Sequence, residues 1–511
     1  MTGRGLMTVS TDVRRYGNLR RPRGAGLFGF SGMSTWIGLG GMLLAMMAMM
    51  VAQAAGAPGL PVALVFTLMT VVAVVPTRRS RRTGLTGYDH VGSRVAHWMG
   101  RENAKAIQGP AGFTPDGKTR LPGMLAGSRL LSARNAYGET FGVIEMPCGK
   151  ATHYSIVLEG AATGTDLVDS DEVDRQVAHW GEALAMLGQQ RDVIGVSVIV
   201  ETAPDPGVRL RAEVESAAAE TASPFSREVM AEIVESYPRS QSTISTRLAI
   251  TLTNADDALA KKHYRTREDM HTLLANLLPG LVASVRVAGA GGACRAMSAQ
   301  EIVDAVRVCF DPTVAEDVER AQRDGGTGLS WEVAGPMLWD PQTEFVAHDR
   351  AWSVTYQMVE PPGTFFANTL EPVLQPHPEI MRKRVALLYR PMGPFEAPRA
   401  VEKDTDSTRR EANKRKATER AVREHAIAQQ VAREEAAGAG LTLFGMAITG
   451  TTDHPDKRAR MESAVKRLAA PARLRMRPSV GNQAAAFLST LPIGVVLPEH
   501  TVLPASIHAE F

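Results

Sequence analysis

One stretch of the sequence matches a motif for phosphate chemistry. Residues 112–119, Gly-Phe-Thr-Pro-Asp-Gly-Lys-Thr, fit the pattern of a nucleotide-binding P-loop. Such a loop needs a buried strand before it and a helix beginning at its Lys-Thr pair, so that free N–H groups face the phosphates. No buried apolar run precedes this stretch, and Pro122-Gly123 opposes a helix after it. We interpret Asp116-Gly117 as a tight turn and keep an NTPase that uses Lys118 as an alternative.

The other residue types that could do chemistry form no pattern in the sequence. His-Glu-x-x-His and Gly-x-Ser-x-Gly are absent, and no pair of cysteines has Cys-x-x-Cys spacing. We therefore predict reduced thiols, and no catalytic, cofactor-binding or metal-binding residues and no cofactor. The isolated histidines and the cysteines are His153, His179, His348, Cys148, Cys294 and Cys309.

The elements that must position any function begin with a long apolar segment. Residues 24–77 contain no Asp, Glu, Lys or Arg, and a turn-like Ala-Ala-Gly-Ala-Pro-Gly at 54–59 divides them. Residues 31–53 are long enough to cross the ~30 Å hydrocarbon core of a bilayer as a helix, and residues 60–75 are at the short limit. The sequence predicts a transmembrane hairpin.

Arginines flank this segment on both sides, and we expect both chain ends in the cytoplasm by the positive-inside rule. The protein would then be a two-pass protein of the cell (inner) membrane. Two alternatives are a cleaved signal peptide, for which two successive apolar runs are too long, and a buried hairpin of a soluble protein. The arginines on the downstream side, where we expect contact with anionic lipid head groups, are Arg78, Arg79, Arg81 and Arg82.

The composition of the remaining chain is that of a globular protein. The net charge is +3, which the arginines near the hairpin account for, so we expect no direct nucleic-acid binding. We predict an α+β fold built from ferredoxin-like antiparallel sheet and helix units. The expected segments are a basic tail at 1–26, the hairpin at 27–77, a linker at 78–120, an α+β body at 121–395, a long charged helix at 396–440, and a carboxyl-terminal α+β unit at 441–511.

Alternation and capping patterns place the elements of the body. Ser298 and Glu301 have the spacing of a capping box. Expected strands are 124–131, 140–146, 153–158, 193–200, 243–253, 285–296, 329–337, 351–360, 385–389 and 441–449. Expected helices are one that opens in the acidic cluster at 166–174 and ends near 187, and those at 226–237, 266–284 with an interruption at 279–280, 298–310, 396–440 and 456–470.

Several short motifs together resemble a known family. The chain is similar to an actinobacterial family of integral membrane proteins linked to conjugative elements and type IV-secretion-like machinery, sometimes grouped with PrgI-like proteins. The motifs are Tyr-Gly-Asn-Leu-Arg-Arg-Pro at 16–22, Gly-Leu-Phe-Gly at 26–29, Leu-Pro-Gly-Met-Leu at 121–125, His-Trp-Gly at 179–181, Leu-Gly at 187–188, Thr-Ala-Pro-Asp-Pro-Gly at 202–207, Phe-Asp-Pro at 310–312, Leu-Tyr-Arg-Pro at 388–391, and Phe-Leu-Ser-Thr-Leu-Pro-Ile-Gly at 487–494.

The resemblance implies a hairpin fused to the amino-terminal, non-ATPase part of a VirB-type secretion ATPase. We would then expect a non-enzymatic scaffold that docks a separate ATPase and other secretion subunits for DNA or protein transfer, and that can form homo-oligomers. The alternatives are a type VII secretion component similar to EccE, and the membrane-bound NTPase. The charged segment 396–440 is expected to pack on its own domain or to bind a partner.

Overall fold

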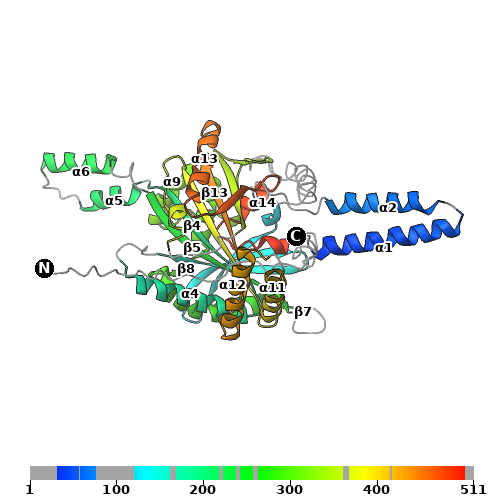
Figure 1. The fold of residues 1–511 in the computed structure, drawn as a ribbon. Helices are drawn as coiled ribbons and strands as arrows, with labels where there is room; N and C mark the ends of the chain where they lie inside the picture. Colours follow the sequence, from blue (N-terminus) through cyan, green and yellow to red (C-terminus); the bar gives the residue numbers. More distant parts are fainter. Residues whose placement is uncertain are drawn as a thin grey trace, which may run out of the picture.

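A computed structural model describes residues 32–56, 58–75, 120–161, 168–205, 207–217, 223–236, 242–256, 263–360, 368–414 and 417–500. The P-loop-like stretch 112–119, the basic tail 1–26 and the arginines at 78–82 lie outside these residues. The described part has two regions: a helical hairpin, and an α+β body that contains a large antiparallel sheet (Figure 1). The predicted α+β class is confirmed.

A twelve-stranded sheet forms the centre of the body, with the order β1-β2-β3-β5-β4-β12-β13-β11-β10-β9 and with β8 and β14 beside this path. The pairs are antiparallel. The strands are β1 (Arg129–Arg134), β2 (Thr140–Cys148), β3 (Ala151–Gly160), β4 (Val193–Pro204), β5 (Ser242–Thr253), β8 (Arg295–Ala296), β9 (Trp339–Pro341), β10 (Val346–His348), β11 (Ala351–Glu360), β12 (Arg382–Pro391), β13 (Thr442–Thr452) and β14 (Arg475–Pro478); β6 (Ala255–Asp256) and β7 (His263–Tyr264) pair separately.

The helices form the separate hairpin, α1 and α2, or belong to the body that contains the sheet. They are α1 (Gly32–Ala54), α2 (Gly59–Val74), α4 (Ser170–Gln189), α5 (Val208–Ala217), α6 (Pro224–Ser236), α7 (Arg267–Val285), α8 (Ala299–Phe310), α9 (Ala315–Arg323), α10 (Glu371–Leu374), α11 (Ala397–Ala412), α12 (Glu419–Ala436), α13 (Arg458–Ala469) and α14 (Gln483–Leu488).

The sheet contains the same connectivity twice, a repeat that sequence identity does not reveal. In the first half, β3-α4-β4-β5-α7-β8 has the order β8-β3-β5-β4, and in the second half β11-α10-β12-β13-α13-β14 has the order β14-β11-β13-β12. Each is a βαββαβ arrangement. The halves join where β4 pairs with β12 in antiparallel register, Val200 opposite Val385. This pairing makes one continuous sheet from two units.

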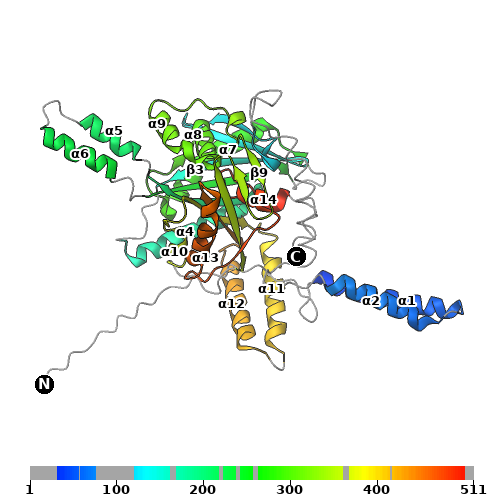
Figure 2. The ribbon, with the colours of Figure 1, turned by 90° about the horizontal axis from the view of Figure 1, so that it is seen from above.

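Each half also carries a helical hairpin between its two middle strands. The first, α5–α6, connects β4 to β5, and the second, α11–α12, connects β12 to β13. Because β4 and β12 are antiparallel, the two hairpins leave from opposite ends of this central strand pair. Both extend away from the sheet (Figures 1 and 2). We call them the α5–α6 arm and the α11–α12 arm.

The two faces of the sheet differ in chemistry. On one face, α4 and α7 pack on the first half, and α10 and α13 pack on the second, over an apolar core that Leu158 and Ile448 exemplify. The other face carries apolar residues over β2, where α8 packs, but a row of buried Ser and Thr side chains crosses its centre. Members of this row include Ser155, Thr251, Ser353, Thr355, Thr449 and Thr451.

Residues 483–494 cover this polar row and complete its hydrogen bonds. The Thr251 hydroxyl donates to the Gly494 carbonyl at 2.7 Å, and the Thr490 hydroxyl lies 2.9 Å from that of Thr449. The Gln483 amide oxygen accepts from the Thr355 N–H at 2.8 Å. Since a buried polar group without a partner costs about 1–3 kcal/mol, this C-terminal segment is part of the fold of the sheet.

Several predicted elements are wrong in detail. The predicted strand 285–296 is a strand only at its end, β8 (Arg295–Ala296). It begins with a π-helical turn, Arg286–Ala290, and the positive φ of Gly289 and Gly291, 97° and 80°, is incompatible with an extended strand there. The predicted strand 329–337 contains instead a 3₁₀ turn around Trp331, whose indole donates to the Ser128 hydroxyl at 3.0 Å. Helix α7 runs through Pro279 without interruption.

Two boundaries were also misplaced. The predicted strand 124–131 opens with a 3₁₀ turn, and β1 begins only at Arg129. The long charged helix predicted at 396–440 is two helices, α11 and α12, packed side by side (Figure 2). The second begins where the Thr418 hydroxyl accepts from the Ala421 N–H at 3.2 Å. The mixed charge pattern gave no indication of this N-cap, so one helix was predicted where there are two.

The close fit of the C-terminal segment predicts a large effect of Gly494→Ala. The added Cβ would lie 2.3 Å from the Thr251 hydroxyl oxygen at a φ of +76°. We expect a loss of about 2–4 kcal/mol in the free energy of unfolding, from overpacking combined with backbone strain. Chemical unfolding of the purified chain, followed by tryptophan fluorescence, measures this change.

A matched control separates crowding from backbone strain. Gly138 has a similar φ of +82° but no atom within 4 Å of an added Cβ. Gly138→Ala should therefore cost only about 1–2 kcal/mol. Equal losses in the two variants would contradict close packing at Gly494.

Candidate functional site

The histidines singled out from the sequence have separate environments. His348 is buried, with one ring nitrogen 2.5 Å from the Phe310 carbonyl and the other 2.7 Å from the Ser353 hydroxyl. His179 lies on α4, 3.2 Å from Glu182. His348 is therefore a buried structural group, and His179 is a surface group. Lys118 of the P-loop-like stretch lies outside the described residues.

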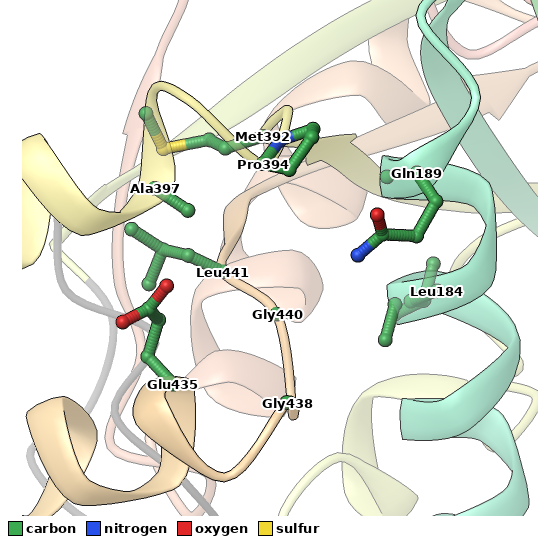
Figure 3. Close-up of a pocket in the computed structure, with 11 residues that line it drawn as sticks. Leu184, Gln189, Met392, Pro394, Ala397, Glu435, Gly438, Gly440 and Leu441 are labelled. Atoms are coloured by element: carbon green, nitrogen blue, oxygen red, sulfur yellow. The ribbon is translucent and has the colours of Figure 1, made fainter.

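A small cavity lies where the α11–α12 arm meets α4 (Figure 3). Its volume is about 90 Å³, far below the roughly 300–1,000 Å³ of typical small-molecule sites. Gln189 and Glu435 are among its lining residues. A Cβ atom added to Gly440 would lie 3.2 Å from Ala185, so the two segments are close together here. We interpret the cavity as a packing joint at the base of the arm.

A buried ionic cluster occupies the polar face of the sheet near the β4–β12 junction. The carboxylate of Glu201 lies 3.0 Å from Arg382, 3.2 Å from Arg247 and 3.9 Å from Arg384. Arg384 is 1 % exposed, and its guanidinium stacks over the Phe487 ring with 4.8 Å between guanidinium carbon and ring centre. The cluster therefore connects both halves of the sheet to the C-terminal segment.

The electrostatics of this cluster favour an ionised carboxylate. Burial alone would raise the pKa of Glu201, but the guanidinium groups of Arg382, Arg247 and Arg384 together lower it to about 2. Lys383, between two of these arginines in sequence, is also buried, and burial lowers its pKa to about 8. Its amine donates to the Gln375 carbonyl. These buried groups form a structural network that is closed to a ligand from solution.

One group of potential metal ligands is brought together only by the fold. The ligand atoms of Cys148, His153 and His500 all lie within 4.8 Å of one another. Cys148 and His153 flank the β2–β3 turn, whereas His500 comes from the far end of the described chain. The sequence offered no signal for this group, because about 350 residues separate His500 from Cys148. Its chemistry is taken up below.

The hairpin α1–α2 exposes an apolar surface that is unusual for a protein in water. It extends away from the body (Figures 1 and 2). Its exposed large apolar side chains are Leu39, Met42, Leu43, Leu44, Met46, Met47, Met50, Val51, Leu60, Leu64, Val65, Leu68, Met69, Val71, Val72 and Val75. At about 1–2 kcal/mol for each side chain removed from water, covering this surface is worth roughly 20 kcal/mol. An exposed apolar surface of this size is typical of a site of contact with a membrane or another protein.

The packing inside the hairpin is close. A Cβ on Gly41 would lie 2.3 Å from the Thr70 side chain, so the glycine lets the two helices approach. The hydroxyls of Thr67 and Thr70 donate to carbonyls four residues earlier, Ala63 and Phe66, both at 2.8 Å. These two hydroxyls are thus satisfied within α2. The bounds of α1 and α2 lie within one residue of the two apolar segments that were predicted to be helical, 31–53 and 60–75.

The hairpin contributes two shorter apolar helices, Gly38–Ala54 and Gly59–Val74. Among the described residues, the one helix that is long and apolar enough to cross a membrane is Arg267–Ala290. This is α7 with its π-helical turn, and Met270, Leu274 and Leu278 on it are buried against the sheet. We assign it to the body. The hairpin therefore remains the apolar surface that needs covering.

The two arms present different surfaces. The base of the α11–α12 arm is buried through Val401 and Ala428, and its outer part carries ion pairs such as Arg409 with Asp406 at 2.9 Å. On α6 of the other arm, Phe225, Val229 and Ile233 are exposed at a four-residue spacing, which places them on one helix face. One arm is ionic and the other has an apolar stripe.

Comparison with known proteins adds no assignment. No protein-family model matches the chain, and no curated protein matches it. What the chain does must therefore be argued from the hairpin, the arms and the body.

The ionic cluster predicts a specific loss of stability in Glu201→Gln. Removing the carboxylate charge leaves three buried guanidinium groups uncompensated, and we expect a loss of about 3–5 kcal/mol at pH 7. Because the folded pKa of about 2 lies below an unfolded pKa of about 4.3, the carboxylate stabilises the wild type above pH 4.3. That contribution should disappear as the pH falls from about 4 to about 2, and Glu201→Gln should lack this pH dependence.

Unfolding titrations across this pH range test the prediction. Glu316→Gln is the control, because Glu316 pairs with Arg211 and Arg320 on the exposed surface. Its effect should stay below about 1 kcal/mol. Similar losses from the two substitutions would show that the cluster does not stabilise the junction.

Proposed function

We propose that this protein is a non-enzymatic scaffold of the cell membrane that docks a separate secretion ATPase in a conjugative, type IV-secretion-like system. The observation that carries the proposal is the exposed apolar surface of α1 and α2 next to a large body with two projecting arms. The resemblance of the motifs in "Sequence analysis" to those of conjugation-linked membrane proteins is the reason for choosing this system.

The anchor argument starts from dimensions. At about 1.5 Å per residue, the 23 residues of α1 span about 35 Å and the 16 residues of α2 span about 24 Å. The first helix is long enough to cross a hydrocarbon core of about 30 Å. The second is shorter than the core and would cross it only with local thinning of the bilayer. Arginines at 78, 79, 81 and 82 follow the second span and would contact anionic head groups. The body would then lie at the cytoplasmic surface, with both termini on that side.

The docking argument rests on the arms. An ATPase that is not covalently attached needs a surface that stands clear of the bilayer and of the core packing. The α11–α12 arm offers an ionic surface, and α6 offers the apolar stripe of Phe225, Val229 and Ile233. Since both arms belong to one continuous sheet, contacts to them would be held in a fixed relation. Self-association of the scaffold through the hairpin is compatible with this arrangement.

The anchor predicts that charge in the hairpin releases the protein from membranes. In Leu43→Arg combined with Leu68→Arg, each arginine should cost about 2.5–3.5 kcal/mol at the centre of a span. We expect most of the double variant to leave the membrane fraction on alkaline extraction and flotation. Tyr137→Arg, at a 78 % exposed position on the body, should stay membrane-bound like the wild type. Equal retention of the double variant would argue against insertion of the hairpin.

The docking role predicts a partner that can be recovered. Affinity purification from crosslinked native membranes, followed by mass spectrometry, should return a hexameric secretion ATPase. Reversing the charges of Arg409 and Arg410 on the α11–α12 arm should lower the yield several-fold. The same change at Arg320 and Arg323 on α9 should leave the yield unchanged. Recovery of the protein alone, or with type VII secretion subunits, would contradict the proposal.

A further inference from the structure

The geometry around Cys148, His153 and His500 suggests a site that the scaffold role does not require. Cys148 is the last residue of β2, and His153 is the third residue of β3. Alternation along the strands places Cys148 on the same face as Ile144, and His153 on the same face as Ser155. Both belong to the polar face that the C-terminal segment covers.

The third residue of the group, His500, lies just after the C-terminal segment 483–494 that covers this face. His500 ends the 3₁₀ turn Leu497–His500, and its ring lies edge-on to that of His153 with centroids 5.3 Å apart. The Cys148 thiol lies 3.0 Å from the carbonyl of Glu499, and the Glu499 carboxylate lies 2.8 Å from Arg390 on β12. These contacts fix the turn against the end of the β2–β3 hairpin.

Polar atoms of the two imidazoles lack partners at this place. His153 is 3 % exposed, and its Nδ1 has no hydrogen-bond partner, nor does the buried Nε2 of His500. A buried polar atom without a partner costs about 1–3 kcal/mol, so two of them beside a thiol are an unusual arrangement. Neutral imidazoles have lone pairs available to bind a cation.

We propose that Cys148, His153 and His500 bind one transition-metal ion of the zinc class, which fastens the C-terminal segment to the β2–β3 hairpin. One sulfur and two imidazole nitrogens are the ligand types that Zn²⁺ prefers. Tetrahedral coordination requires ligand atoms about 3.3–3.8 Å apart, as follows from Zn–N and Zn–S distances of about 2.0 and 2.3 Å. Ligand atoms within 4.8 Å of one another need to close by at most about 1.5 Å to reach this geometry.

Metal binding releases one proton and leaves the two imidazoles uncharged. The Cys148 thiol loses its proton to solvent as the metal–sulfur bond forms, and the two imidazoles bind as neutral ligands. Three protein ligands leave a fourth position for water. The ion would close a loop of about 350 residues, so the expected effect is to hold the end of residues 483–500 in place.

The test is metal binding by the full chain, purified in detergent without a histidine tag and stripped with chelator. Equilibrium dialysis against Zn²⁺, followed by elemental analysis, should give about one ion per chain. Co²⁺ substitution should give a thiolate-to-cobalt charge-transfer band and the strong visible absorption of a four-coordinate site. Zn²⁺ should also raise the melting temperature by several degrees.

Single variants decide whether these residues are the ligands. Cys148→Ser, His153→Ala and His500→Ala should each lower zinc affinity at least tenfold and abolish the cobalt bands. His500 is partly exposed and lies at the end of the described chain, so we expect His500→Ala to fold. This variant therefore still tests the proposal if His153→Ala, at a buried position, fails to fold. Cys294→Ser and His179→Ala are controls that should bind like the wild type. Absence of stoichiometric zinc in the wild type, or unchanged binding in His500→Ala, would overturn the proposal.

Discussion

The hydrogen bonds between the polar face of the sheet and residues 483–494 are the interaction on which the body depends. A row of buried Ser and Thr hydroxyls crosses both halves of the sheet, and the row is completed by Gln483, Thr490 and the carbonyl of Gly494. Each such bond adds only about 1 kcal/mol, but leaving the groups unpaired inside the body would cost more. Residues 483–494 therefore stabilise the polar face of the sheet that the β4–β12 pairing forms. The ionic cluster at Glu201 and the stacking of Arg384 on Phe487 act at the same interface.

The repeated βαββαβ connectivity explains how the arms are placed. Antiparallel pairing of β4 with β12 turns two similar units into one sheet, and the hairpin inserted in each unit then leaves from the opposite end of the central strands. The arms differ in surface chemistry although they occupy equivalent positions. This separation suits a body that holds different partners apart. The apolar hairpin α1–α2 adds a constraint of another kind, because its exposed side chains require an environment other than water.

Local patterns predicted much of this fold. Dense β-branched runs and alternation located β2, β3, β4, β5 and β11, and the Ser298–Glu301 capping box located the start of α8. The failures have local causes: the positive φ of Gly289, the hydrogen-bonded Trp331, and the N-cap at Thr418 that divides the charged segment. The long-range features could not be predicted from one sequence. The pairing of β4 with β12, the polar face and the Cys148–His153–His500 group each join residues far apart in the chain, and no spacing rule connects them.

The central claim is that α1 and α2 cross a bilayer twice and leave the body at its cytoplasmic surface. Topology reporters fused after residue 511 and inserted at the turn between α1 and α2 test this most directly. We expect the carboxyl-terminal fusion to be active only with reporters that work in the cytoplasm, and the turn insertion only with reporters that work outside the membrane. An externally active carboxyl-terminal fusion, or a mature protein recovered freely soluble, would contradict the account.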